Sequence, residues 1–354
     1  MCVSKCKSQS RSMLRSILLI PTIIFCGLMA LIGCTGNNDY EDAEPSLTPL
    51  LWHITAPNGQ TAYLFGSIHS ANESIYPLPD YVMDAFYRSD YLVLEIDVHN
   101  NPEDFMFYRI WVQEQRRLYG GAGSIVDDLG EEFVTRAARA LLDMRDYTPL
   151  ALFHNANLTG NSTSYEWWRV LSGTAALYLS SRANLWGRYG VDNHFAFAAM
   201  ERGMEIIQLE CFREREELFA SWPTWMIIHD LERMMDYIEA DNFLTYDNSF
   251  SWRSITYEEL FNMWKTGDEQ AIARANAPPS EFGADDLTDE QIEIREWGHN
   301  IHIQRARIMK EGITNILAAE KQAFIVMGVG HIAGENSISQ WLREEGYEVV
   351  RVQE

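Results

Sequence analysis

Two mostly apolar runs, residues 62–65 and 323–327, lie near opposite ends of the chain. Each continues into a glycine and, three positions later, a histidine, and each is followed by a loop, an amphipathic stretch and another apolar run. Such near-continuous apolar runs are typical of strands that are buried on both faces of a parallel sheet. The pattern therefore predicts two related units, each made of a strand, a Gly-x-x-His loop, a helix and a second strand.

The later elements of these two units follow the same plan. The first unit has a predicted helix over residues 80–88 and a strand that starts at Tyr91, and the second has a helix over 337–345 and a strand over 347–352. One Gly-x-x-His pattern is a weak signal. Two of them, each after an apolar strand in a matching unit, point to a shared role.

A third unit is predicted between them. Its helix opens at Gly190 to Asp192 and ends at Gly203, a residue type that favours helix C-caps, and its strand MEIIQL leads to Glu210. Elsewhere helices dominate. They include a stripe of Leu129, Phe133, Ala137 and Leu141, a second stripe from Trp222 through Trp225, Ile228, Leu231 and Met235 to Ile238, and a long helix over about 289–317 with Gly298 and Gly312 as expected kinks.

Strands that alternate with helices predict an α/β fold. We expect a largely parallel or mixed central sheet flanked by helices, with two related halves separated by large helical insertions. Residues 51–354 are interpreted as a single domain. Ligands of such sheets bind at the carboxyl ends of the strands, and His69, His331 and Glu210 would lie there, with Glu95 within or near the end of its own strand.

The N-terminal residues have the order of an export signal. Basic residues up to Arg15 precede an apolar run from Ile17 to Ile32, which Pro21 interrupts and which leads to Cys34. We expect residues 1–33 to be a lipoprotein signal peptide, Cys34 to be lipidated, and 34–50 to be a flexible acidic tether. The protein would then be exported and lipid-anchored to the cell envelope, at the outer membrane if there are two. The alternative is an uncleaved membrane anchor.

The charge of the chain excludes one class of partner. Its 354 residues include 28 basic and 51 acidic ones, for a net charge of -23, while a 47% hydrophobic content is ample for a packed core. A strongly negative surface repels nucleic acid, so we expect no nucleic-acid partner and no attraction to anionic lipid headgroups beyond the lipid anchor.

His69 and His331 are the strongest candidates for chemistry. Two imidazoles with one or two carboxylates can hold a divalent ion and leave a position open for water. Glu95 and Glu210 are the carboxylates best placed, one to bind the ion and the other to act as general base. The alternative is structural, with hydrogen-bonded histidines and ion-paired glutamates. Asp192 would then be a helix N-cap.

Other residues are weaker candidates. Ser67 lacks the Gly-x-Ser-x-Gly elbow of serine hydrolases. His229 is expected to be solvated, and His299 and His302 lack the His-Glu-x-x-His pattern of zinc peptidases.

Three segments carry a resemblance to a known family. LWHITAPNGQTAYLFGSIHSANESIYPLPDYVMDAFYRSDYLVLEID, YGVDNHFAFAAMERGMEIIQLECFREREELF and FIVMGVGHIAGENSISQWLREEGYEVVRV are similar to the TraB/GumN family, which includes the TIKI proteins of animals. The resemblance runs from about Leu51 to Val352. It implies an α/β fold with two related halves and, for the TIKI branch, a peptidase that depends on a divalent metal.

The resemblance also implies roles for individual residues. His69 and His331 match the two Gly-x-x-His motifs, and Glu95 and Glu210 match acidic positions of the family. The expected ligands are therefore His69, His331 and Glu95, around manganese or cobalt rather than zinc. Arg305 falls where the family has Arg-Asn, but Ala306 replaces the asparagine.

Two hypotheses of different classes follow. The first is a membrane-anchored metal-dependent hydrolase of peptides or proteins, with Glu95, Glu210 and Arg305 as catalytic residues. The second is a lipoprotein that binds a peptide, a signal molecule or haem in the same cleft without catalysis, which the departure at Ala306 favours.

Overall fold

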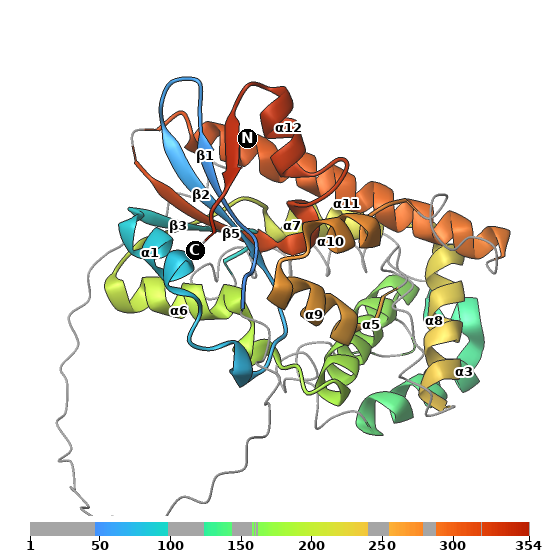
Figure 1. The fold of residues 1–354 in the computed structure, drawn as a ribbon. Coiled ribbons are helices and arrows are strands. Elements are labelled where there is room, and N and C mark those ends of the chain that lie inside the picture. The colour runs from blue at the N-terminus through green and yellow to red at the C-terminus, as the bar shows by residue number, and fades with distance from the viewer. Residues whose placement is uncertain are drawn as a thin grey trace, which may run out of the picture.

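A six-stranded mixed sheet lies at the centre of the protein, in the order β4-β3-β5-β2-β1-β6 (Figure 1). The fold is that of a computed structural model, which describes residues 47–97, 124–143, 158, 160, 162–239, 255–278, 288–319 and 321–353. The strands are β1 (Leu51–Thr55), β2 (Thr61–Ser67), β3 (Tyr91–Leu94), β4 (Glu205–Gln208), β5 (Ala323–Gly328) and β6 (Glu348–Arg351). The predicted α/β class is confirmed.

Four neighbouring strands, β4, β3, β5 and β2, run parallel to one another. In the pairing of β2 with β5, Gly66 lies opposite Met327 and Ser67 lies opposite Gly328. The two strands that end in Gly-x-x-His are therefore direct neighbours, although most of the chain separates them. Their carboxyl ends, and the loops that follow, lie side by side.

β1 was not predicted as a separate strand. It pairs antiparallel with β2 on one side and with β6 on the other. Because β3 pairs with β5 and β6 pairs with β1, the second strand of each unit does not lie beside the first strand of the same unit. The two related units are thus interleaved in one sheet and share one core.

Helices cover both faces of this sheet (Figure 1). In chain order the helices are α1 (Asp80–Arg88), α3 (Ile125–Asp143), α5 (Ser164–Arg182), α6 (Val191–Arg202), α7 (Phe212–Ala220), α8 (Thr224–Glu239), α9 (Tyr257–Thr266), α10 (Glu269–Ala275), α11 (Asp289–Ile316) and α12 (Ile338–Glu344). Figure 1 shows α1 and α6 on one side of the sheet and α11 and α12 on the other.

An aromatic cluster joins α1 and α6 to the sheet. Phe195 of α6 lies 4.8 Å from Phe324 of β5 and 5.0 Å from Phe86 of α1, measured between ring centroids. Phe65 of β2 completes the cluster at 5.7 Å from Phe195. These rings are fully buried, so their packing contributes strongly to the position of the first Gly-x-x-His strand.

The helices predicted up to Gly203 and over about residues 289–317 are confirmed. α6 ends at Gly203, which has the left-handed φ of 63° of a C-cap, and α11 covers 28 residues after a capping box at Thr288. Gly312 has a packing role in α11, because a Cβ atom there would lie 2.8 Å from Leu209. The predicted helix through Leu129 contains a break, since Gly130 has φ 80°.

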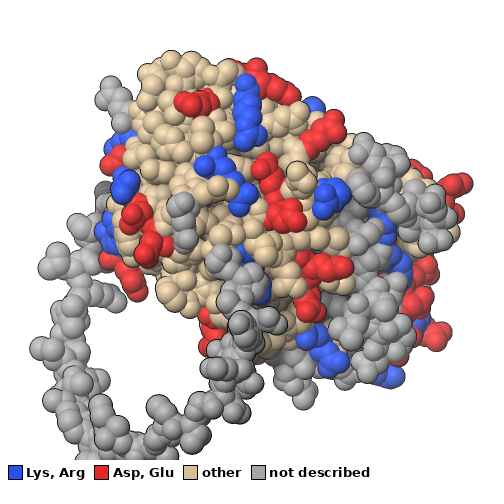
Figure 2. Space-filling model, viewed as in Figure 1, with Lys and Arg blue, Asp and Glu red and all other residues tan. Residues whose placement is uncertain are grey.

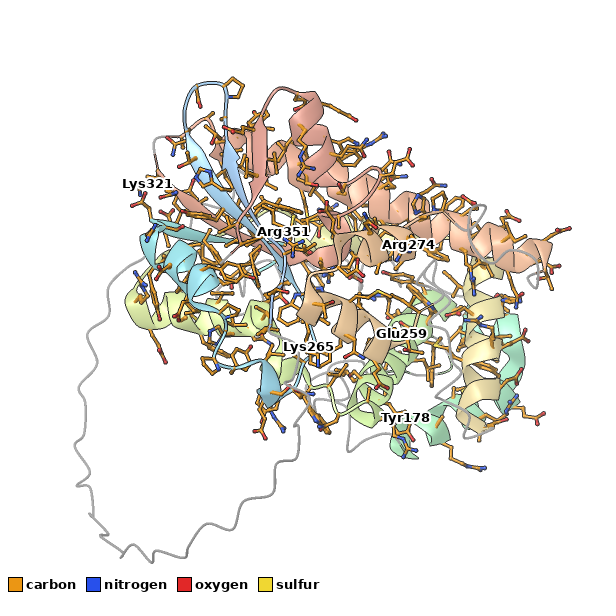
Figure 3. All side chains as sticks on the ribbon, in the orientation of Figure 1. Tyr178, Glu259, Lys265, Arg274, Lys321 and Arg351 are labelled. Atoms are coloured by element: carbon orange, nitrogen blue, oxygen red, sulfur yellow. The ribbon has the colours of Figure 1, made fainter. Side chains whose placement is uncertain are left out.

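α3, α5 and α8 pack on one another and form a second hydrophobic cluster with Trp167, Trp168 and Trp222. Figure 3 shows Lys321, just before β5, at the edge of the sheet away from Tyr178 of α5. The predicted stripe on α8 is wrong at Trp225, which is 40% exposed. The helix instead turns Met226, Ile227 and Met234 into the cluster, together with Leu231 and Met235 of the predicted stripe.

The visible face carries acidic and basic side chains next to each other (Figure 2). None of the helices in the described ranges combines the length and apolar character that a membrane crossing requires. The predicted signal peptide, Cys34 and most of the tether lie outside the described residues. These assignments, like the single domain, stay predictions.

Candidate functional site

The two Gly-x-x-His loops and Glu95 meet at Gly328, the last residue of β5. A Cβ atom at Gly328 would lie 3.1 Å from Glu95 Oε1, 3.7 Å from His69 Nε2 and 3.8 Å from His331 Cδ2. The backbone N–H of Gly328 donates to Glu95 Oε1 at 2.6 Å. The structure therefore brings together three of the residues that the sequence singled out, around a position where a Cβ atom would sit tightly against Glu95.

Gly66, the glycine of the first motif, allows the close contact between the two loops. A Cβ atom at Gly66 would lie 2.8 Å from Ile332 Cδ1 and 3.0 Å from Val329 Cγ2, both from the second loop. The indole N–H of Trp264, on α9, donates to the carbonyl oxygen of Gly66 at 2.7 Å. The loop after β5 thus packs directly on β2, and α9 is joined to the same strand by this hydrogen bond.

Asp192 holds the imidazole of His69. Its Oδ2 lies 2.8 Å from His69 Nδ1, and its Oδ1 accepts a hydrogen bond from Ser67 Oγ at 2.7 Å. The residue is not the helix N-cap that one interpretation predicted, because Gly190 caps α6. The carboxylate of Asp192 raises the pKa of His69 to about 9. His69 remains 69% exposed, with Nε2 directed toward Gly328.

The approach of α6 to the first loop depends on Gly190. A Cβ atom there would overlap the carbonyl oxygen of His69 and lie 2.8 Å from its carbonyl carbon. The backbone N–H of Val191 donates to the carbonyl oxygen of Ile68 at 3.0 Å. The Gly-x-Asp segment therefore docks by its backbone and delivers Asp192 to the imidazole.

His302, which the sequence placed among the weaker candidates, supports the second loop. Its ring stacks on His331 with centroids 3.9 Å apart and planes 13° apart. Its Nε2 lies 3.0 Å from the carbonyl oxygen of Gly330, which can only accept, so Nε2 carries the proton. Asn276 Nδ2 donates to the same oxygen at 3.0 Å. His302 lies three residues before Arg305 on α11, and this spacing was the available signal.

Arg305 joins the two predicted glutamates. Its Nε donates to Glu210 Oε1 at 3.0 Å, and its Nη2 donates to Glu210 Oε2 at 2.6 Å and to Glu95 Oε2 at 3.0 Å. The side chains are largely buried, with 3% exposure for Glu210, 11% for Glu95 and 15% for Arg305. One guanidinium thus faces two carboxylates, in the bidentate geometry that arginine favours.

This arrangement keeps the site ionised. Burial alone would raise the pKa of Glu95, but Arg305, His69 and the Gly328 N–H outweigh it and lower the pKa. Burial alone would lower the pKa of Arg305, yet Glu210 and Glu95 raise it above the ordinary value. Glu95 is therefore anionic and the guanidinium of Arg305 is charged at neutral pH.

The types of side chain at this site are suitable ligands for a divalent ion. The imidazoles and the carboxylate are common ligands of such ions, and Asp192 supports His69 as carboxylates commonly support metal-binding histidines. Across the described ranges, however, no three His, Cys, Asp or Glu side chains stand ready around one point. Both oxygens of Glu95 already accept hydrogen bonds, from Gly328 and Arg305, so an ion there competes with Arg305.

The chain is similar to known proteins along most of its length. The sequence profile of the TraB/PrgY/gumN family matches residues 50–351. The chain is 22% identical to human "Metalloprotease TIKI1" over 368 aligned positions, which cover 95% of this chain and 68% of that protein. No solved structure matches.

Proposed function

Because this chain belongs to the TraB/PrgY/gumN family, we propose that it is a metal-dependent hydrolase that cleaves peptides. The observation that carries the proposal is that His69 Nε2, Glu95 Oε1 and the His331 ring all lie close to Gly328. The distant similarity to a metalloprotease supports the same class of reaction.

His69, His331 and Glu95 are the residues that would hold the ion. Asp192 fixes the ring of His69 through Nδ1, so Nε2 is the nitrogen available for binding, and the stacked ring of His302 orients His331. A divalent ion such as manganese or cobalt would supply Lewis-acid polarisation of a substrate carbonyl.

The remaining charged residues position and balance this set. Both oxygens of Glu210 accept from Arg305, and its side chain is 3% exposed, so we assign it to holding Arg305 rather than to proton transfer. Arg305 in turn orients Glu95. Its guanidinium is placed to stabilise negative charge that develops on a substrate oxygen nearby.

Elemental analysis of the purified protein tests the metal site first. We expect a stoichiometric divalent ion in the wild type and its loss in the His69→Ala, His331→Ala double variant. A His53→Ala variant is the control, since His53 lies on β1 against Tyr63 and outside the site. Equal metal content in all three proteins would contradict the assignment.

Cleavage of a broad peptide library tests the reaction. Chelation should abolish cleavage by the wild type, and added Mn²⁺ or Co²⁺ should restore it. The proposal fails if the metal-loaded protein and its His69→Ala variant cleave the library equally poorly.

A second candidate is a lipoprotein that binds a peptide, signal molecule or haem without cleaving it. Ala306, fully buried beside Arg305, favours it, because an alanine provides no amide at this position. Equilibrium binding of an intact ligand, unchanged by chelator, would select this function over hydrolysis.

A further inference from the structure

A pocket of about 230 Å³ adjoins the candidate site. Its apolar walls come from three places in the chain: Trp168 on α5, Phe219 and Trp222 around the end of α7, and Ile301 on α11. The site lies next to it because His302 and Arg305 line the pocket as well.

His302 and Arg305 make the pocket continuous with the proposed reaction centre. The ring of His302 stacks on His331, and Arg305 donates to Glu95 Oε2. A group bound in the pocket would therefore be one side chain away from two of the proposed metal ligands. This is the place where a side chain of a bound peptide, near the bond to be cleaved, would lie.

The volume suits one large side chain. Pockets for drug-sized ligands measure roughly 300–1,000 Å³, so this pocket is too small for a whole ligand of that size. An apolar cavity of about 150 Å³ is enough to bind benzene. A phenyl ring or a long aliphatic side chain therefore fits within the 230 Å³.

The walls are fixed in place and their charge is balanced. Trp168 Nε1 donates to the buried Asp230 at 3.1 Å, and the rings of Trp168 and Trp222 lie 5.9 Å apart. Arg169, which also lines the pocket, donates twice to Glu216, whose side chain is fully buried. The guanidinium of Arg169 also lies over the rings of Trp168 and Phe219, 5.8 Å and 5.2 Å from their centroids. An apolar guest would therefore contact mainly Trp222, Ile301 and the edges of those two rings.

We infer that this pocket between α5, α7 and α11 is a specificity pocket that takes a large apolar side chain, aromatic or long aliphatic, of the peptide substrate. The inference rests on the proposed function, because only that function makes the bound peptide a substrate. The pocket itself can be tested by binding alone. Burial of a phenyl ring there should favour a phenylalanine peptide over its alanine counterpart by about tenfold or more.

A larger side chain at Gly173 would fill the pocket. It lines the pocket from the interior of α5, and a Cβ atom at this position would meet no heavy atom of the described residues within 4 Å. Gly173→Leu should therefore occupy the pocket without disturbing the fold. Gly173→Ala is the matched control, because it makes the same backbone change and raises helix propensity while leaving most of the volume open.

The experiment measures binding to the metal-free full chain in chelator, by the fluorescence of the pocket tryptophans, with two capped tripeptides, acetyl-Ala-Phe-Ala-amide and acetyl-Ala-Ala-Ala-amide. Wild type and Gly173→Ala should prefer the phenylalanine peptide by about tenfold or more. Gly173→Leu should reduce that preference to about twofold or less. Unchanged thermal melting of both variants shows that the fold is intact.

Two results overturn the inference: equal affinity of the wild type for the two peptides, or a phenylalanine preference that Gly173→Leu leaves intact. A cleavage assay with Mn²⁺ separates this question from the proposed function. Selective binding without any cleavage contradicts hydrolysis and leaves the pocket standing. Cleavage that is indifferent to large apolar side chains contradicts the pocket and leaves hydrolysis standing.

Discussion

Gly190 illustrates, at the scale of single residues, how a missing side chain brings a carboxylate to a histidine. Any Cβ atom at this position would collide with the backbone of His69. The short distance between Asp192 and His69 depends on this close approach, as does the hydrogen bond from Val191 to Ile68. Backbone atoms cannot yield as the tip of a flexible side chain can, so the position should tolerate no substitution.

Gly190→Ala should therefore lower the free energy of unfolding by about 1–3 kcal/mol, as overpacking commonly does. Urea denaturation measures the change. Gly173→Ala is the matched control, since its added methyl group meets open space among the described residues and should leave stability equal or slightly higher. Equal stability of the Gly190→Ala variant and the wild type would show that α6 can move away from the loop without cost.

Glu216 is a second residue whose environment leads to a testable prediction. Its side chain is fully buried, accepts two hydrogen bonds from Arg169 and another from Tyr165, and forms an ion pair with Arg215. Burial alone would raise the pKa of Glu216, but Arg169 and Arg215 outweigh it, so the pKa lies below its ordinary value of 4.5. The carboxylate thus joins α5 to α7 beside the pocket.

Glu216→Gln should lower the free energy of unfolding by about 2–4 kcal/mol at pH 7, because the partly buried guanidinium groups of Arg169 and Arg215 lose their fully buried anion. The folded pKa is below the unfolded one, so this stabilisation is present above about pH 4.5 and is lost as the pH falls through the folded pKa. The gap between wild type and variant should close on acidification, as urea denaturation at a series of pH values would show.

Glu217→Gln is the control for this experiment. Glu217 pairs with Arg213 at 2.8 Å, but both side chains are well exposed, so the change should cost less than about 1 kcal/mol. A cost for Glu216→Gln that is as small as this, or that does not depend on pH, would contradict the role of Glu216 as a buried counter-ion.

At the scale of elements, the two Gly-x-x-His loops are supported by different parts of the fold. α6 supports the first loop through Gly190 and Asp192, whereas α10 and α11 support the second through Asn276 and His302. Equivalent motifs therefore depend on unrelated neighbours. The loops should respond separately to changes in these helices.

His302→Phe tests the support of the second loop. Phenylalanine keeps a ring against His331 but loses the donor to the Gly330 carbonyl oxygen, so the loop is held less firmly. Loss of such support for a metal ligand should weaken Mn²⁺ binding about tenfold or more, measured by titration calorimetry. His53→Phe, on β1, should leave the affinity unchanged. Wild-type affinity in the His302→Phe variant would argue against a positioning role.

At the scale of the whole molecule, the N-terminal sequence predicts how the domain is anchored. The basic residues, the apolar run and Cys34 form the order of a lipoprotein signal, and an acidic stretch separates Cys34 from β1. We propose that the mature chain begins at a lipidated Cys34 and is held at the cell envelope. The net charge of -23 makes attraction to anionic headgroups a poor alternative.

Cys34→Ser should abolish this anchoring. In a bacterial host that processes lipoproteins, we expect the wild type in the membrane fraction and in the detergent phase of a Triton X-114 separation. The variant should keep its N-terminal segment and gain no lipid, which mass spectrometry of the intact protein detects. An unmodified, uncleaved N-terminus in the wild type would favour a permanent membrane anchor.

Much of the secondary structure could be predicted from the sequence, because strands, helices and helix caps depend on local patterns of apolar and polar residues. The apolar runs before Gly66 and Gly328, the helix end at Gly203 and the capping box at Thr288 are of this kind. The Gly-x-x-His motifs also identified His69 and His331 before any geometry was known.

Only the tertiary structure decided which of these residues are neighbours. Three contacts at the site join residues that are more than 90 positions apart. They are the pairing of Ser67 with Gly328, the contact of Asp192 with His69, and the hydrogen bonds from Arg305 to Glu95 and Glu210. The role of His302 and the pocket beside it also depend on contacts between segments that are distant in the sequence. Local pattern specifies an element and its buried face, but the partner of that face is set by how the whole chain packs.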